Sequence, residues 1–436
     1  MYAVAITKTN GSIKKRKENL TMNKHITRFL LFFSISLVLA FGILARPSST
    51  FAHYSQHLLA NQTDLVGSVA PFHPTIKLSQ TSGPPTTQVI VRGTGFGVNE
   101  NVSITLDSTP IGSTKTSRTR TFSTGITIPR YVSPGNFVVE ATGKTSGRSA
   151  QALFLVQTNW NMFGDNARHS HFNPYENSIA PGNAVKLSNG WLFHTGSVIG
   201  SSPAVVNGVV YVGSNDGNVY AIERTTGAKV WSYSIGVGIV ETSPAVVNGV
   251  VYVGQSIDAM SANLYALNAK TGAKLWSYTT RGGIGSSPTV VDGIVYFGSG
   301  DGNVYALNAK TGAKLWSYTT GNAIISSPAV AHGVVYIGSG DGNVYAFNAK
   351  TGAKVWSSNI GSFIESSPTV ANGLVYIGAQ DDSLSLLDAA TGAKLWSATT
   401  GSPLSLQGIS SSPTVVNGAV YIGSRDGNLY TFCICG

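Results

Sequence analysis

The sequence predicts an all-β protein whose C-terminal region is a six-bladed β-propeller. A segment of about 40 residues recurs along residues 201–436, and each copy holds about four short strand patterns separated by turn residues. No helical period of comparable strength appears in that region. A repeat of this length with four strands is typical of a propeller blade, and the fold accepts roughly four to eight blades.

The most regular copy runs from Gly285 to Thr320 and reads GSSPTVVDGIVYFGSGDGNVYALNAKTGAKLWSYTT. A tryptophan closes each copy, and successive tryptophans are 40, 45, 40, 40 and 40 residues apart. Because each one recurs at the same phase, we expect a structural role, in which burial between blades contributes about 1.5–3 kcal/mol per side chain. The six tryptophans are Trp191, Trp231, Trp276, Trp316, Trp356 and Trp396.

Side-chain chemistry divides this copy into four strands. The expected strands are residues 286–291, 294–298, 304–308 and 314–318. The first turn is Asp292-Gly293, the second is the Asp-Gly-Asn run that begins at Asp301, and the third is Thr311-Gly312. Asp-Gly and Gly-Asn pairs accept the positive φ that a tight hairpin needs. Three hairpins in succession give an antiparallel meander.

The repeat resembles the pyrroloquinoline-quinone (PQQ)-like propeller family. The pattern of that family, alanine, then Thr-Gly, then tryptophan, stands here as Ala306, Thr311-Gly312 and Trp316, and it recurs from Ala266 and from Ala346. The segment 159–176 (NWNMFGDNARHSHFNPYE) is similar to the leading peptide of those proteins. The resemblance implies the fold and leaves the activity open, because the family contains both quinoprotein dehydrogenases and non-enzymatic scaffolds of outer-membrane assembly.

The two ends of the repeat region complement each other. Complete copies start at Ser201, Thr242, Ser286, Ser326 and Ser366, whereas the copy from Ser411 stops before its fourth strand. Val185–Thr195 (VKLSNGWLFHT) reads as a fourth strand without a blade. We therefore predict that this N-terminal strand completes the last blade by strand exchange, which leaves no free edge.

Four segments follow from composition. Residues 1–52 are expected to be a signal peptide with an upstream extension, because an apolar run of 17 residues (29–45) follows Lys24 and Arg28; initiation at Met22 is the alternative to Met1. An uncleaved single membrane anchor is the other interpretation of this run. Residues 53–73 read as a linker, 74–157 as a β-sandwich and 158–436 as the propeller. The expected location is therefore secreted or at the cell surface.

The segment 74–157 has its own β pattern. About seven alternating strand patterns over some eighty residues suggest an immunoglobulin-like sandwich. GTGFGVNENVSI, within this segment, looks like Ig-like repeats of the IPT/TIG type in bacterial surface proteins. Its expected role is to hold the propeller away from the cell surface.

Charge excludes a nucleic-acid partner. The formal net charge is +10, but residues 1–52 carry +7, residues 53–200 carry +4 and residues 201–436 carry −1. The propeller is thus neutral and offers no basic patch for nucleic acid. Contact with a membrane is expected only through the N-terminal segment, if that segment is not cleaved, and the protein is expected to be a monomer.

No catalytic, cofactor or metal residue is assigned from the sequence. The resemblance would imply PQQ stacked on an indole, a pair of adjacent cysteines and an acidic calcium cluster. The only cysteines are Cys433 and Cys435, which we expect to be free thiols or partners for another chain, because alternate strand positions rarely meet disulfide geometry. PQQ and calcium are therefore possible by resemblance only. His169, His171, His194 and His332 form no pair at metal spacing and stay unassigned.

The aspartates of turn two are more typical of turn residues than of calcium ligands. Such an aspartate bonds to its own backbone, and no glutamate or second ligand strand accompanies it here. Turn two carries Asp216, Asp301, Asp341 and Asp426, with Asp381 and Asp382 nearby, and turn three carries Lys229, Lys274, Lys314, Lys354 and Lys394. Strand parity places turn two and the connections between blades on one face (the Asp face) and turns one and three on the other (the Lys face).

The Asp face is the predicted partner-binding face. Its connections between blades are apolar, and the two insertions in the repeat, 255–262 and 402–408, fall on it. Contiguous apolar loops usually mark a contact surface. The predicted contact residues are Glu241, Ile257, Met260, Ile324, Ile325, Phe363, Ile364, Glu365, Leu404 and Leu406.

Two functions of different classes follow. The first is a non-enzymatic scaffold that binds a protein or cell-envelope polymer through the Asp face. The second is a PQQ-dependent oxidoreductase or redox protein. The departures from the family at the cysteines and the acidic cluster favour the scaffold.

Overall fold

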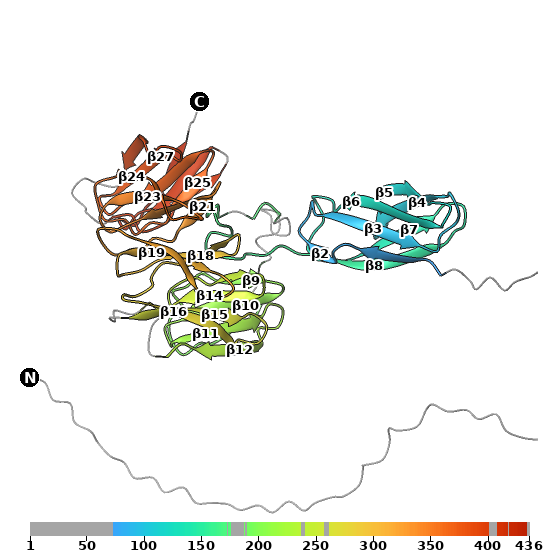
Figure 1. Cartoon of the computed structure of the whole chain (residues 1–436), viewed down its shortest axis with the longest axis horizontal. Coiled ribbons are helices and arrows are strands. Elements are labelled where there is room, and N and C mark those ends of the chain that lie inside the picture. Colours follow the sequence, from blue (N-terminus) through green and yellow to red (C-terminus); the bar gives the residue numbers. More distant parts are fainter. Residues whose placement is uncertain are drawn as a thin grey trace, which may run out of the picture. The chain divides into compact units, whose positions relative to one another are not determined.

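The computed structural model describes residues 73–171, 173–175, 187, 190–236, 240–256, 261–400, 408–416 and 418–433. These residues form strands, turns and loops (Figure 1). Among them there is no helix with the length and hydrophobicity of a membrane span. The signal peptide and most of the linker fall on residues 1–72, which lie outside the described residues.

The first eight strands form two sheets around one core. A three-stranded sheet has the order β1-β3-β6, and a five-stranded sheet has the order β2-β8-β7-β4-β5. Alternate residues of β3 are buried, including Val89 and Val91, and they pack with Ile104 and Phe154. The strands are β1 (Thr75–Leu78), β2 (Ser82–Gly83), β3 (Gln88–Thr94), β4 (Asn101–Leu106), β5 (Thr109–Lys115), β6 (Thr121–Thr127), β7 (Gly135–Gly143) and β8 (Ser149–Val156). The immunoglobulin-like assignment stays a prediction.

The repeat region forms successive antiparallel sheets, one for each copy, whose strands follow in chain order. Sheets one to five are four-stranded, and sheet six has three strands among the described residues. Sheet one comprises β9 (Ala204–Val206), β10 (Val209–Ser214), β11 (Asn218–Glu223) and β12 (Lys229–Ser234); sheet two comprises β13 (Ala245–Val247), β14 (Val250–Gly254), β15 (Ala262–Asn268) and β16 (Lys274–Thr280). Sheet three comprises β17 (Thr289–Val291), β18 (Ile294–Gly298), β19 (Asn303–Asn308) and β20 (Lys314–Thr319).

The later sheets repeat this plan (Figure 1). Sheet four comprises β21 (Ala329–Ala331), β22 (Val334–Gly338), β23 (Asn343–Asn348) and β24 (Lys354–Asn359); sheet five comprises β25 (Thr369–Ala371), β26 (Leu374–Gly378), β27 (Ser383–Asp388) and β28 (Lys394–Thr399); sheet six comprises β29 (Thr414–Val416), β30 (Ala419–Gly423) and β31 (Leu429–Cys433). The predicted meander is thus observed. The innermost strands are shorter than predicted, because the serines that precede them bond to the neighbouring sheets.

A β-bulge in the outer strand lets the tryptophan face inward. In sheet three Ala306 pairs with Trp316, but Leu307 pairs with Lys314, so that Leu315 is the extra residue. Leu315 is 47% exposed and Trp316 is 8% exposed. An extra residue in one strand re-aims the side chains on either side of it. The same register shift occurs in each four-stranded sheet.

Each docked indole is held by the following sheet. Trp316 donates its Nε1–H to the carbonyl oxygen of Ala349, at 2.9 Å, and the hydroxyl of Tyr296 donates to the same oxygen at 3.0 Å. The corresponding indole bonds join Trp231 to Ala269, Trp276 to Ala309 and Trp356 to Ala389. The tryptophans therefore lie between sheets, in the structural role that their periodicity predicts.

The predicted strand exchange is not observed as a backbone ladder among the described residues, and residues 185, 186, 188 and 189 of the predicted strand lie outside them. Residues 190–200 form no strand, and β31 pairs only with β30 among the described residues. The Trp191 indole nevertheless docks on sheet one, where it donates to the carbonyl oxygen of Arg224 at 2.8 Å, as the indole of each outer strand docks on the following sheet. This single indole contact holds the tryptophan in place without a backbone ladder. Consistent with an uncovered sheet six, Tyr421 is 39% exposed, whereas Tyr296 at the same phase is 2% exposed.

A chain of serines links the innermost strands, and the sequence analysis missed it. The backbone N–H of Ser287 donates to the Oγ of Ser327 in the next sheet at 2.9 Å, and the backbone N–H of Ser327 donates to the Oγ of Ser367 at 2.9 Å. The same bond runs from Ser202 to Ser243, from Ser243 to Ser287 and from Ser367 to Ser412. The recurring Ser-Pro pair carries the signal for this chain, because its serine stands at one phase of the repeat.

The segment 160–171 lies across the innermost strands, and we call it the axial segment. Trp160 forms an antiparallel bridge with Val205 of sheet one. The carbonyl oxygen of Ala167 accepts from the N–H of Val330 at 2.6 Å, and that of Arg168 accepts from Val370 at 3.1 Å. One short peptide thus contacts sheets one, four and five.

Candidate functional site

The aspartates of the Asp face are fixed by hydrogen bonds. The carboxylate of Asp301 accepts from the backbone N–H of Asn303 at 3.0 Å and from that of Arg281, in the preceding connection, at 3.1 Å. Asp216 and Asp341 accept from the corresponding backbone groups. These bonds are those of turn aspartates that also secure the connection between sheets.

A tyrosine completes each of these turns. The hydroxyl of Tyr305 donates to the carboxylate of Asp301 at 2.7 Å, and Asp216, Asp341 and Asp426 have the same partner four residues on. Burial alone would raise the pKa of Asp301, but the bonds from Tyr305 and Asn303 together lower it. The bond from Tyr430 lowers the pKa of Asp426 to about 2. The recurring DGNVY run held the signal for this pair, which the sequence analysis missed.

Two predicted contact residues are part of the core, so their prediction as exposed loop residues is wrong. Ile324 and Ile364 are fully buried. A side chain added at Gly298 would collide with Ile324, and one added at Gly338 would collide with Ile364. Each isoleucine fills the space above a strand-two glycine, which is why the connection is apolar at this point. Apolar residues of the connections therefore include both core and surface positions, which residue type alone does not distinguish.

Other predicted residues remain at the surface of the Asp face. Ile325 is 42% exposed, Phe363 is half-buried and Glu241 is exposed. Val198 and Ile199, in the connection before sheet one, are 68% and 46% exposed. The described part of the Asp face thus presents apolar side chains beside an acidic one. Ile257, Met260, Leu404 and Leu406 lie outside the described residues.

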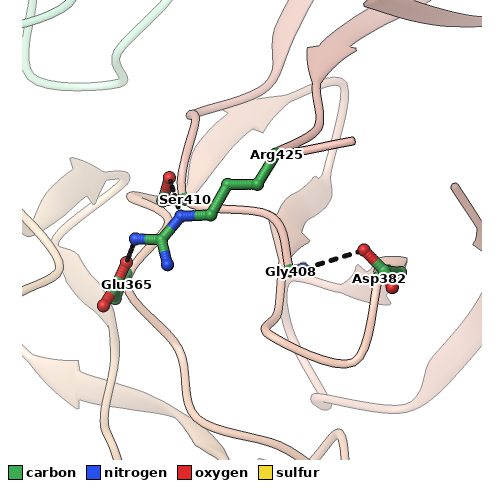
Figure 2. Close-up of polar contacts among 5 residues, drawn as sticks. All are labelled: Glu365, Asp382, Gly408, Ser410 and Arg425. Atoms are coloured by element: carbon green, nitrogen blue, oxygen red, sulfur yellow. Dashed lines mark hydrogen bonds and ion pairs between the residues drawn. The ribbon is translucent and has the colours of Figure 1, made fainter. Parts of the chain in front are cut away.

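Glu365 is paired with a cation of the next sheet (Figure 2). The Arg425 guanidinium donates through Nη2 to Glu365 Oε2 at 2.7 Å and through Nε to Ser410 Oγ at 3.2 Å. Asp382 accepts from the backbone N–H of Gly408 at 2.9 Å, in the same region of sheets five and six. Glu365 therefore links sheets five and six through this ion pair, in addition to its predicted position on the Asp face.

The Lys face carries its cations at turn three. The five predicted lysines are exposed, and Lys270, Lys310 and Lys350 add a second exposed cation in three of these turns. Turns one and three lie at the same end of each sheet, as the backbone bond from Ala349 to Gly333 illustrates. The strand-parity argument for the two faces is thus consistent with the observed turns.

A cavity of about 840 Å³ opens on the Lys face. The axial segment contributes Asn166 and Arg168, and turn one of sheets three to five contributes Asp292, His332 and Asn372. Lys350 of turn three stands beside them, and the lining also includes Val330, Val370 and Ala331, which are buried. The sequence alone does not predict this cavity, because residues from three sheets and a distant segment meet only in the folded chain.

His169 of the axial segment is fully buried. Its Nδ1 lies 3.1 Å from the carbonyl oxygen of Pro368 and its Nε2 lies 3.4 Å from Thr289 Oγ1. Burial, together with the neighbouring His171, lowers the pKa of His169 to about 3. Phe163 packs edge-on against both rings. The two histidines, which the sequence left unassigned, thus meet in the interior of the propeller.

Cys433 is disulfide-bonded, so the prediction of free thiols is wrong for this residue. That prediction assumed two alternate positions of one strand. The strand β31 ends at Cys433, so the assumption fails, and Cys435 lies outside the described residues.

The described residues do not fit the quinone site that the resemblance implies. Of the six tryptophans of the repeat, five donate their indole N–H to a backbone carbonyl. The sixth, Trp396, packs against Phe432. The axial segment covers innermost strands, and no three acidic, histidine or cysteine side chains of the described chain converge as metal ligands.

Comparison with known proteins agrees with the propeller fold. A family model described as outer membrane protein assembly factor BamB matches residues 157–320 and 321–434. Lupanine 17-hydroxylase (cytochrome c) of Pseudomonas sp. is 25% identical over 100 residues, which are 22% of this chain and 14% of that protein. The chain therefore matches a small part of this relative's length.

Two solved structures are also similar. A europium-containing methanol dehydrogenase aligns with a TM-score of 0.53 and 16% identity, over 61% of this chain and 68% of its own. BamB from Moraxella catarrhalis aligns with a TM-score of 0.40 and 21% identity, over 56% of this chain and 86% of its own. At such identity the methanol dehydrogenase shows a common fold and no common activity.

Proposed function

Because this chain belongs to the family described as outer membrane protein assembly factor BamB, we propose that it is a non-enzymatic scaffold of the cell envelope that binds a protein partner through the Asp face. The observation that carries the proposal is the exposure of Val198 and Ile325, apolar side chains at surface positions of two connections between sheets. The protein is proposed to be secreted or held at the cell surface through the N-terminal apolar run 29–45.

The chemistry of the face indicates the partner. Ile325 and Val198 offer apolar contact area, and Glu241 supplies a negative charge beside sheet two. Exposed apolar side chains with a charged rim are typical of protein interfaces. The partner surface should therefore combine apolar and basic side chains. A cell-envelope polymer without apolar groups would leave the apolar side chains uncovered.

The experiment compares two surface substitutions of similar exposure. Ile325→Glu places a charge on the Asp face, and Leu315→Glu places one on the outer strand of sheet three, where Leu315 is 47% exposed. Full-length variants are used to capture cross-linked envelope proteins, which are identified by mass spectrometry. We expect Ile325→Glu to lose the partner that both the wild type and Leu315→Glu retain. Loss of that partner with Leu315→Glu alone would overturn the choice of face.

The quinone-dependent alternative gives a different result in a second experiment. PQQ and calcium are added to the purified protein, and the absorbance spectrum and dye reduction are followed. Because the indoles are engaged between sheets, we expect no spectral shift and no dye reduction. A saturable shift that Trp316→Phe leaves unchanged would show a quinone site elsewhere in the chain and would overturn the non-enzymatic proposal.

A further inference from the structure

The cavity on the Lys face combines an apolar floor with cations. Val291, Ile294 and Ala371 are partly exposed within the lining, beside the buried Val330. Arg168 and Lys350 bring two cations to the rim, and Asp292 brings one carboxylate. A ligand that fills this space must therefore offer apolar surface and negative charge together.

The cations stand on fixed backbone. The N–H of Arg168 donates to Asn166 Oδ1 at 3.0 Å, and its carbonyl accepts from Val370, so the residue is tied to sheet five. Lys350 follows Ala349, whose carbonyl receives the bonds from Trp316 and Tyr296. Both side chains are exposed. A fixed base with an exposed charged head is suited to bind an anion without reorganising the fold.

The surroundings extend the positive charge beyond the cavity. Lys310 and Lys314 are exposed on turn three of sheet three, and Lys354 is exposed on turn three of sheet four. A surface with one sign of charge attracts ligands of the opposite sign and raises their association rate. A phosphate polymer would satisfy the cations but would leave the apolar floor uncovered. An acidic peptide satisfies both, because apolar and carboxylate side chains alternate on an extended chain.

We propose that this cavity is a second protein-binding site, which takes an extended acidic segment of a partner with an apolar side chain on the floor and a carboxylate on Arg168 and Lys350. The site lies on the face opposite to the one proposed for the scaffold function and is independent of it. A propeller with both sites would bridge two proteins. The arginine can hold a carboxylate through two parallel hydrogen bonds, which gives it the larger share of the specificity.

The test uses isothermal titration of the full chain with a short synthetic peptide of alternating leucine and glutamate. Lys350→Glu is compared with Lys270→Glu, which makes the same charge change at the same position of the repeat, away from the cavity. We expect Lys350→Glu to weaken binding by about tenfold or more and Lys270→Glu by less than about twofold. Arg168→Gln should act like Lys350→Glu, with Arg224→Gln as its control.

Other peptides separate this proposal from general electrostatic attraction. A serine–glutamate peptide should bind at least about tenfold more weakly, because it lacks groups for the apolar floor. Equal losses with Lys350→Glu and Lys270→Glu would overturn the proposal in favour of diffuse attraction. Equal binding of the two peptides, or no binding by the wild type, would also overturn it. Ile325→Glu should leave the affinity unchanged, which separates this site from the Asp face.

Discussion

The indole N–H of Trp316 donates to the carbonyl oxygen of Ala349 across the boundary between sheets three and four, at 2.9 Å. The same carbonyl receives the hydroxyl of Tyr296. Because Trp316 and Tyr296 belong to one sheet and Ala349 to the next, this oxygen unites two neighbouring copies of the repeat. Packing and hydrogen bonding thus act at the same point, and their separate contributions can be measured.

Removal of a docked indole should lower the free energy of unfolding, by an amount that increases with the burial of the side chain. Trp316→Ala is expected to lower the free energy of unfolding by about 3–5 kcal/mol, because the side chain is 8% exposed. Trp396→Ala removes the same side chain at the same phase, where it is 41% exposed, and should cost about half as much. Denaturant titration of both variants measures the difference. Equal losses would show that the indole contributes through its own sheet alone.

Substitution of the glycine beneath each indole should destabilise the fold. Gly352 has a φ of +72°, and an added Cβ would lie 2.6 Å from Cδ2 of Trp316. Gly373 has a φ of +76° with open space around its Cα. We expect Gly373→Ala to cost about 1 kcal/mol for the backbone alone and Gly352→Ala about 2–4 kcal/mol, because overpacking is added.

Thermal denaturation of the two glycine variants, monitored by tryptophan fluorescence, separates these effects. Both have the same backbone conformation, so the difference reports the collision with the indole. Identical melting temperatures would mean that the indole shifts at no cost.

Loss of one serine from the chain should destabilise the fold, because it leaves a buried N–H without an acceptor. In Ser327→Ala the buried N–H of Ser287 loses its acceptor, which we expect to cost about 1–3 kcal/mol. Ser317→Ala, at an exposed position of β20, is the matched control and should change stability by less than about 0.5 kcal/mol. Amide hydrogen exchange at Ser287 provides a local readout, because faster exchange is expected in the first variant only.

His169 should make the fold acid-sensitive. Its pKa is lowered from 6.5 to about 3 by burial, so the folded state holds the neutral ring and the unfolded state protonates first. The stability that this group contributes is therefore complete above about pH 6.5 and is lost as the pH falls towards 3. The expected slope is at most about 1.4 kcal/mol per pH unit.

The check is urea denaturation between about pH 4 and pH 7. His169→Gln should flatten the dependence of stability on pH, and the exposed His332→Gln should leave it unchanged. A dependence that survives in His169→Gln would assign the acid sensitivity to another group, such as His171, whose pKa is also lowered by burial.

The strands and turns of each copy could be predicted because the residues that determine them lie within the copy itself. Strand β18 has the predicted bounds, and the turns follow from Asp-Gly and Thr-Gly pairs that tolerate positive φ. Contacts between copies were predicted only where a large aromatic side chain recurs at one phase of the repeat, as at Trp316. The bond between Ser287 and Ser327 was missed, because serine is common in loops and only its phase in the repeat distinguishes it.

The candidate sites show the limit of a linear pattern. Ile324 and Ile325 are adjacent and chemically alike, yet the first is fully buried and the second is 42% exposed. Ile324 fills the space above Gly298 of β18, a proximity that the sequence alone does not show. The cavity could not be predicted either, because Arg168 and Lys350, which both line it, are 182 positions apart in the chain.

The serine chain has a consequence for how such a protein changes over generations. Each of the second to fifth copies gives one bond to its successor and receives one from its predecessor, through the same two atoms. A duplicated copy would therefore fit between any two others without new chemistry at either border, and a deleted copy would leave neighbours that still match. The number of repeats can change by recombination of near-identical stretches, while the contacts that hold the repeats together stay the same.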